Sequence, residues 1–213
     1  TRQFYQPLGA VDLTGFITKE QLTPREALQR QFQSMPVGTP WGMKWEYGWF
    51  RGRIVLPEAA RGKRIVLKVF GGDESAIYVN GESAGARDHF HTEITLARNA
   101  APGAQYDILF ETYAGHGARV VSGGPLPIGR ETVPEVTAPQ AIIQPVTYGI
   151  WEEDAYQIWI DLETLLQVRD HNDPNSLRVA KIDEALRKFT VIADFELPHE
   201  EMMQSLRDAR AFL

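Results

Sequence analysis

The chain of 213 residues contains no cysteine. Disulfide bonds and every cysteine-ligated zinc or iron–sulfur site are therefore excluded. The absence agrees with a reducing compartment, and we expect a cytoplasmic location. No run of about 18 apolar residues is present, so we expect no transmembrane helix. The first residues lack both the apolar segment of a signal peptide and an initiator Met, so we expect a fragment or a trimmed product.

Positive charge is also scarce. The chain carries 22 Lys and Arg against 28 Asp and Glu, which gives a formal net charge of −6. Nucleic-acid binding favours a basic patch, and an anionic membrane surface attracts polybasic runs. Because the basic residues are few and scattered, we expect neither a nucleic acid nor a membrane as a partner.

Catalytic side-chain pairs are missing as well. Glycosidase chemistry needs two carboxylates that face one sugar, but the adjacent Asp73 and Glu74 point apart in an extended chain. Ser83 and Ser122 stand near glycines, and we expect neither to form a nucleophile elbow. We therefore predict no catalytic residue in this chain.

One histidine pair suggests a metal site. His89 and His91 lie two residues apart, which places them on one face of a strand next to Asp88. Two such ligands need at least a third with suitable spacing. Because no third ligand with suitable spacing accompanies them, we favour structural roles for both histidines and predict no metal ligand.

The features that are present begin with a series of strand-like segments. They are rich in β-branched and apolar residues, and they cover residues 53–56, 64–70, 76–80, 89–96, 105–113 and 140–150. Asn80-Gly81 between two of them is a strong hairpin signal. Glycine and proline separate the segments at intervals of about 8–12 residues, which is typical of an antiparallel two-sheet sandwich. We predict this sandwich over residues 36–150.

The sandwich is flanked by two other segments. Residues 1–35 are mixed in character and predict an N-terminal arm with a short helix, which starts at the capping box formed by Thr23 and Glu26. Residues 151–213 show three helical patterns with one apolar stripe each. These helices need a surface to bury against, which is either one another, the sandwich or a domain outside this chain. The fold class is therefore α+β.

Two aromatic groups are candidate sugar contacts. Trp45, Tyr47 and Trp49 alternate along one expected strand, so they would share one face as a stacking platform. The competing interpretation places them in the core, and we favour it because large aromatic side chains usually fill cores. Tyr113 and His116 stand where a strand enters a long Gly-rich loop, a common place for ligand contacts. The alternative for His116 is a cap on that loop, and both interpretations stay open.

Several motifs together resemble a known family. They are WG at 41–42, WFRGRIVLP at 49–57, YVNG at 78–81, Asp88-x-x-His91-x-x-Ile94-x-Leu96 and YAGH at 113–116. This combination resembles the N-terminal region of glycoside hydrolase family 38 α-mannosidases, in the branch of bacterial and fungal vacuolar-type enzymes. The resemblance implies a jelly-roll domain, then a short helical segment and then a catalytic domain.

The same resemblance implies where the chemistry lies. In that family a catalytic Asp nucleophile and a zinc ion held by His and Asp act on mannose. Those residues belong to a catalytic domain introduced by a Gly-His-x-His-x-Asp type of motif, which this sequence does not contain. We therefore expect no cofactor in this chain, and zinc in the catalytic domain that it lacks.

Taken together, the residues and the resemblance predict a jelly-roll-like sandwich followed by three helices. We expect the non-catalytic N-terminal part of an α-mannosidase, inactive alone, which supports its own catalytic domain and shapes a cleft for mannosides. An autonomous carbohydrate-binding module is the alternative, with Trp45, Trp49, Tyr113 and His116 as its candidate contacts. An oligomerisation module that forms a homo-oligomer is a third reading.

Overall fold

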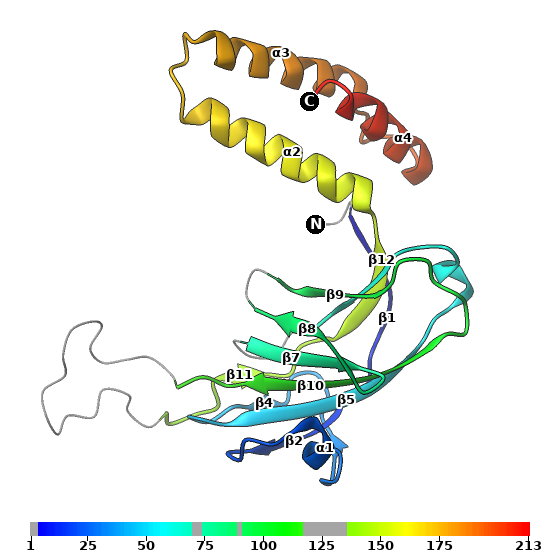
Figure 1. Ribbon diagram of the computed structural model, residues 1–213, viewed down its shortest axis with the longest axis vertical. Coiled ribbons are helices and arrows are strands. Elements are labelled where there is room, and N and C mark those ends of the chain that lie inside the picture. The colour runs from blue at the N-terminus through cyan, green and yellow to red at the C-terminus, as the bar shows by residue number, and fades with distance from the viewer. Residues whose placement is uncertain (1–3, 70–73, 89–90, 117–135) are drawn as a thin grey trace, which may run out of the picture. The chain divides into compact units, whose positions relative to one another are not determined.

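The computed structural model describes residues 4–69, 74–88, 91–116 and 136–213 (Figure 1). The chain divides into two compact units. One unit comprises Pro7–Ile150, and the other joins the N-terminal residues up to Gln6 to the segment Trp151–Leu213. Strands make up the first unit and helices dominate the second, which confirms the predicted sandwich followed by three helices.

Two antiparallel sheets form the sandwich. The larger has the order β3 (Gln33–Ser34), β2 (Thr14–Thr18), β5 (Tyr47–Val55), β10 (Gln105–Tyr113), β7 (Glu74–Val79), β8 (Glu82–Arg87). The smaller has the order β1 (Tyr5–Ala10), β12 (Thr147–Trp151), β6 (Ile65–Lys68), β9 (Glu93–Ala97). β4 (Pro40–Trp41) pairs with β11 (Ala141–Ile142), and a 3-10 turn spans Glu58–Ala60.

Strand alternation separates the two faces of the six-stranded sheet. Phe50 on β5 stands opposite Phe110 on β10, and both are buried in the core that the two sheets share. Their rings lie 5.3 Å apart. The neighbours of Phe50 along the strand, Trp49 and Arg51, lie on the other face, because successive side chains of a strand alternate. We call this other face the outer face; the candidate site lies on it.

The N-terminal residues differ from the prediction. The predicted boundary at residue 36 is too late, because β1, β2 and β3 precede it and belong to the sheets, with β2 paired to β5. Gly15 interrupted the apolar pattern of β2, and the structure shows why it is needed. A Cβ atom there would lie 2.5 Å from Cδ1 of Phe50 and 2.7 Å from the carbonyl oxygen of Trp49.

Two local signals in the sequence are confirmed. The Thr23 hydroxyl accepts a hydrogen bond from the Glu26 amide at 3.3 Å, and the Thr23 amide donates to the Glu26 carboxylate at 2.8 Å. This capping box starts α1, which spans only Pro24–Ala27. Asn80 and Gly81 have φ angles of 53° and 84°, as the turn of a two-residue hairpin requires, and they join β7 to β8.

The second unit contains α2 (Glu153–Asp170), α3 (Leu177–Ile192) and α4 (His199–Arg210). Their apolar stripes bury against one another, in a cluster of Ala155, Ile158, Phe189, Met202, Met203, Leu206 and Ala209. Phe4 packs against the same cluster. Arg210 joins α4 to α2 through an ion pair with Asp161 at 2.8 Å. Within the described residues, none of the helices combines the length and the apolar character that crossing a membrane requires.

Candidate functional site

Trp49 is part of the structural core rather than a sugar contact. Its side chain is 0% exposed. It packs under α1 in a cluster with Ala27 and Leu109, against which Phe16, Leu22, Phe32 and Tyr78 also lie. Because a fully buried side chain is not accessible to a ligand, the prediction of Trp49 as a candidate sugar contact is wrong. The core interpretation applies to Trp49.

Trp45 does not continue the face of Trp49, because β5 begins only at Tyr47. The preceding residues form a turn, in which the Glu46 amide donates to the Met43 carbonyl at 3.1 Å. Trp45 itself has a φ of 66° and is 45% exposed. Its amide donates to the Gly115 carbonyl at 3.1 Å, and its ring lies edge-on to His116 at 5.7 Å. The structure therefore brings Trp45 and His116 together.

Tyr113 lies beside a different aromatic residue. It stands opposite Tyr47 in the β5–β10 ladder, and the two rings are 5.2 Å apart. Both line a depression of about 260 Å³ on the outer face, together with Glu74 and Glu111. Burial raises the pKa of Glu111 above its ordinary value. The depression offers an aromatic pair and two carboxylates, which is a small surface for a polar ligand.

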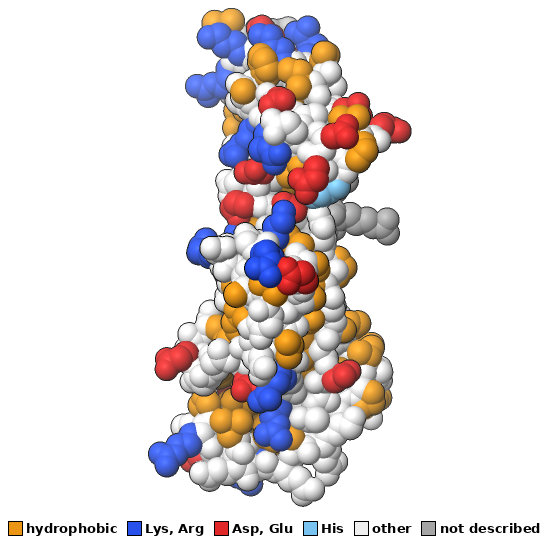
Figure 2. Space-filling view, turned by 90° about the vertical axis from the view of Figure 1, so that its right-hand side faces the viewer, with side chains coloured by type: hydrophobic (Ala, Val, Ile, Leu, Met, Phe, Trp, Pro, Cys, Tyr) orange, Lys and Arg blue, Asp and Glu red, His pale blue; other side chains and the backbone are white. Residues whose placement is uncertain are grey.

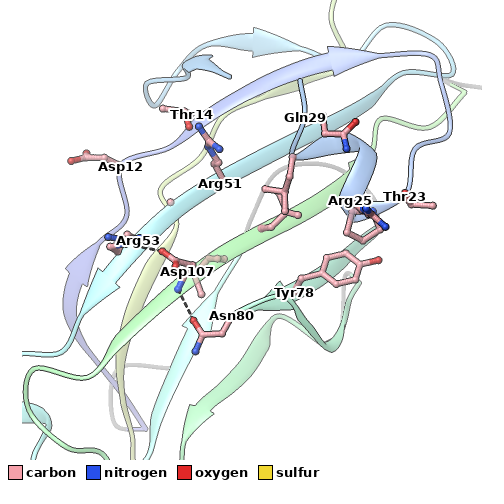
Figure 3. Close-up of a pocket in the computed structure, with 16 residues that line it drawn as sticks. Asp12, Thr14, Thr23, Arg25, Gln29, Arg51, Arg53, Tyr78, Asn80 and Asp107 are labelled. Carbon is pink, nitrogen blue, oxygen red and sulfur yellow. Dashed lines mark hydrogen bonds and ion pairs between the residues drawn. The ribbon is translucent and has the colours of Figure 1, made fainter. Parts of the chain in front are cut away.

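A larger groove on the outer face was missed by the sequence interpretation. It encloses about 1220 Å³ and lies between α1 and the strands β5, β7 and β10. We call it the α1 groove. Most of its lining side chains are polar, and those labelled in Figure 3 are Asp12, Thr14, Thr23, Arg25, Gln29, Arg51, Arg53, Tyr78, Asn80 and Asp107. In the sequence, Arg51 and Arg53 alternate with Phe50, Gly52 and Ile54, a pattern that indicates an exposed strand face and not a groove.

The polar groups of the α1 groove are held in place. Arg53 Nε donates to Asp107 Oδ1 at 2.7 Å, and this hydrogen bond together with the charge of Asp107 raises the pKa of Arg53 above its usual value. The Asn80 side-chain oxygen accepts a hydrogen bond from the Asp107 amide at 2.9 Å. Figure 3 shows Asp107 as the centre of both contacts. The Arg51 guanidinium lies 4.1 Å from the ring centre of Phe32.

The segment Gly81-Glu82-Ser83-Ala84-Gly85 has the Gly-x-Ser-x-Gly pattern, which the sequence interpretation overlooked. A nucleophile elbow places that serine between a strand and a helix. Here the segment leaves a hairpin turn and forms most of β8, an edge strand of the six-stranded sheet. Ser83 therefore lies within a strand and not at the strand-to-helix turn of a nucleophile elbow, as expected from the sequence.

The metal candidates are only partly described. His89 lies outside the described residues. His91 turns back on Asp88, with its amide 2.7 Å from Oδ1 and its ring Nδ1 3.0 Å from both carboxylate oxygens. Within the described ranges, no group of three or more His, Asp or Glu side chains is placed to hold a metal ion. The contact with Asp88 gives His91 a structural role.

We expect the pKa of the His91 ring to lie above its ordinary value of about 6.5, because the hydrogen bond and the charge of Asp88 stabilise the protonated ring. A raised pKa in the folded state stabilises the fold below the unfolded-state pKa. That contribution is lost as the pH rises through the folded-state pKa. Titration by NMR checks this, and Asp88→Asn should lower the pKa toward its ordinary value, with the charge of Glu93 as a smaller raising effect that remains. An unchanged pKa in that variant contradicts the assignment.

The two antiparallel sheets around one core define a jelly-roll type of β-sandwich domain. The family model described as "Alpha-mannosidase, jelly roll domain" matches residues 8–131, which is more than half of the chain. The chain therefore belongs to the α-mannosidase jelly-roll domain family, and the resemblance found in its motifs is confirmed.

Individual relatives agree with the family. The chain is 25% identical to alpha-mannosidase 2C1 of Homo sapiens over 158 residues, and 24% identical to that of Mus musculus over 163 residues. The matches cover 73% and 75% of this chain. The chain spans about 15% of the length of these curated relatives.

Solved structures give a weaker likeness. A β-glucuronidase from Ruminococcus gnavus in complex with an N1-substituted uronic isofagomine is 14% identical, with a TM-score of 0.46. The match covers 70% of this chain and 30% of that chain. At this TM-score the likeness supports no functional conclusion.

Proposed function

We propose that this chain is the non-catalytic N-terminal part of an α-mannosidase and that it supports the catalytic domain of the full-length enzyme. The family match over residues 8–131 carries the proposal. The relatives are named α-mannosidases, and the chain spans only about 15% of their length. On this proposal the hydrolysis of terminal α-mannosides belongs to the full-length enzyme, which we place in the cytoplasm.

The surface of the helical unit supports a structural role. Although the helices bury one stripe each, large apolar side chains remain exposed, and they are Trp159, Leu177, Val191, Phe195 and Phe212. Figure 2 shows apolar side chains exposed among charged ones over the helices. Val191 and Phe212 also line a groove of about 570 Å³. Exposed apolar surface of this kind is typical of contact with another protein part, and we assign that contact to the catalytic domain.

Zinc belongs to the same proposal, through the resemblance to family 38. The described residues of this chain do not fit a zinc ion, because none of their His, Asp and Glu side chains form a suitable group. We assign zinc to the catalytic domain, as the resemblance to family 38 implies. The role proposed for this chain requires no metal.

The proposal predicts no hydrolysis of an aryl α-mannoside by the 213-residue chain alone, because it assigns the two catalytic carboxylates to the catalytic domain of the full-length enzyme. Release of the aryl group, followed by absorbance, measures this, with the full-length enzyme as the positive control. Hydrolysis that stays with the chain through repeated purification contradicts the proposal.

The carbohydrate-binding module remains the second candidate function, but with a different set of contact residues from the one predicted. The burial of Trp49 removes the centre of the predicted platform. Trp45 with His116 and Tyr47 with Tyr113 remain as two separate aromatic pairs. The exposure of Trp45 favours this candidate, since an exposed ring is available for stacking on a sugar.

A further inference from the structure

We propose that the α1 groove is a saccharide-binding site in which Arg51, Asn80 and the Arg53–Asp107 pair bind the hydroxyl groups of an oligosaccharide. This site uses none of the aromatic pairs described above. The site also does not depend on which reaction the full-length enzyme catalyses. The saccharide site and the proposed α-mannosidase function can therefore fail independently of each other.

The size of the groove favours an extended ligand. Its volume of about 1220 Å³ exceeds the ~300–1,000 Å³ of typical small-molecule pockets. Its floor is the outer face of β5, β7 and β10, and α1 with the residues after it forms one wall (Figure 3). A groove of this volume with one wall accommodates several sugar units.

The polar groups suit neighbouring hydroxyls. Guanidinium, carboxylate and amide groups are planar, and each presents two atoms that bind a pair of hydrogen-bonding partners. Arg53 and Asp107 hold each other at 2.7 Å and so present donors and acceptors side by side. The side-chain oxygen of Asn80 is engaged by the Asp107 amide, which orients the side chain and leaves its NH₂ group for a ligand. Each sugar hydroxyl both donates and accepts, so it matches such a mixed surface.

Arg51 is the most available donor of the groove. Its guanidinium lies 4.1 Å from the ring centre of Phe32, and this contact restrains the side chain without using its hydrogen-bond donors. Among the residues that the structure describes, Arg51 has no carboxylate partner. A restrained cation with open donors loses little conformational entropy on binding.

The groove also has an apolar surface for a sugar ring. Tyr78 stacks on the buried Trp49, with centroids 6.5 Å apart and planes inclined by 19°. Tyr78 and Leu109 both line the groove. The C–H face of a sugar packs on such side chains while its hydroxyls reach the polar groups, a combination typical of small-molecule sites.

A polypeptide strand fits the groove less well. Peptides that extend a sheet pair with an edge strand. The floor here consists of β5 and β10, which are central strands paired on both sides, and of β7, which is paired with β10 and β8. Their main-chain groups are therefore already used, and no edge is open for a peptide strand to extend the sheet here.

The test begins with the labelled 213-residue chain on an array that carries mannosyl, galactosyl, glucosyl and glucuronosyl oligosaccharides. We expect saturable binding, and calorimetric titration with the strongest glycan gives its affinity. Arg51→Gln should weaken that affinity about tenfold, the usual cost of losing a charged hydrogen bond. Arg61→Gln is the matched control, because Arg61 pairs with Glu58 outside the groove, and it should leave the affinity unchanged.

A second variant tests whether weaker binding could result from misfolding. Asn80→Gly removes the amide but suits the φ of 53° at this position, so the turn should form while glycan binding weakens. Affinity that falls with added salt identifies a uronic-acid ligand, and affinity that does not fall identifies a neutral one. An array without binding, or binding unaffected by both variants, overturns the proposal. A further outcome is that Arg51 in the full-length protein is protected from modification by phenylglyoxal although the protein binds no glycan. That result assigns the groove to a polypeptide and also overturns the saccharide proposal.

Discussion

Replacing Trp49 with alanine is expected to destabilise the jelly-roll unit by about 3–5 kcal/mol, the usual cost of deleting a buried Trp side chain. The indole is 0% exposed and fills the space between the outer face of the sheet and α1. Its removal leaves a cavity beside Ala27 and Leu109 and removes the ring on which Tyr78 stacks. Equilibrium unfolding in urea, followed by circular dichroism, measures the loss.

Trp45→Ala is the matched control for Trp49→Ala. Trp45 is 45% exposed, so its truncation should change stability by no more than about 1 kcal/mol. Its φ of 66° disfavours tryptophan and alanine alike, so the comparison isolates the side chain. Equal destabilisation by the two variants, or a Trp49→Ala variant as stable as the wild type, contradicts the core assignment.

The second large effect concerns the apolar surface of the helical unit. Val191 and Phe195 are 85% and 57% exposed in this chain. If the catalytic domain covers them, Val191→Ser combined with Phe195→Ser removes up to about 3 kcal/mol of buried apolar contact for each side chain in the full-length enzyme. We therefore expect a lower midpoint of thermal unfolding and lower mannosidase activity.

The same double variant in the isolated chain provides the control. There both side chains face solvent, so the change in stability should stay within about 0.5 kcal/mol for each position. A full-length enzyme that unfolds at the wild-type temperature and keeps its activity would show that this surface is not covered by the catalytic domain.

Much of the fold follows from local signals in the sequence. The Asn80-Gly81 turn, the capping box of Thr23 and Glu26, and the three helical stripes all form where they were expected. These features depend on residues close in sequence, which is why they are readable from it. The family was recognisable for a different reason, since its motifs are short and cluster between residues 41 and 116.

The aromatic face was mispredicted because the strand was started too early. The prediction treated Trp45 to Trp49 as one continuous strand. A turn that ends at Glu46 precedes β5, so Trp45 lies outside the strand and does not share the face of Trp49. Trp49 then belongs to a cluster completed by α1, whose docking no local pattern reveals. The same holds for the start of the sandwich, where Gly15 weakens the apolar pattern of β2 because Phe50 needs its space.

The α1 groove was not predictable for a related reason. Arg51 and Arg53 come from β5, Asn80 from the turn after β7, and Asp107 from β10. These residues meet only after long-range strand pairing, which the sequence does not reveal. Alternating arginines on a strand usually indicate a solvent-exposed face, and only the position of α1 turns this face into a groove.

Aryl α-mannoside hydrolysis by the full-length enzyme, with and without this chain, tests the central claim most directly. If the chain supports the catalytic domain, an enzyme that lacks it should lose most of its activity and stability. Adding the separately produced 213-residue chain should restore both through a complex visible in light scattering. A catalytic domain that is fully active and stable alone, and that forms no complex with this chain, would contradict the account.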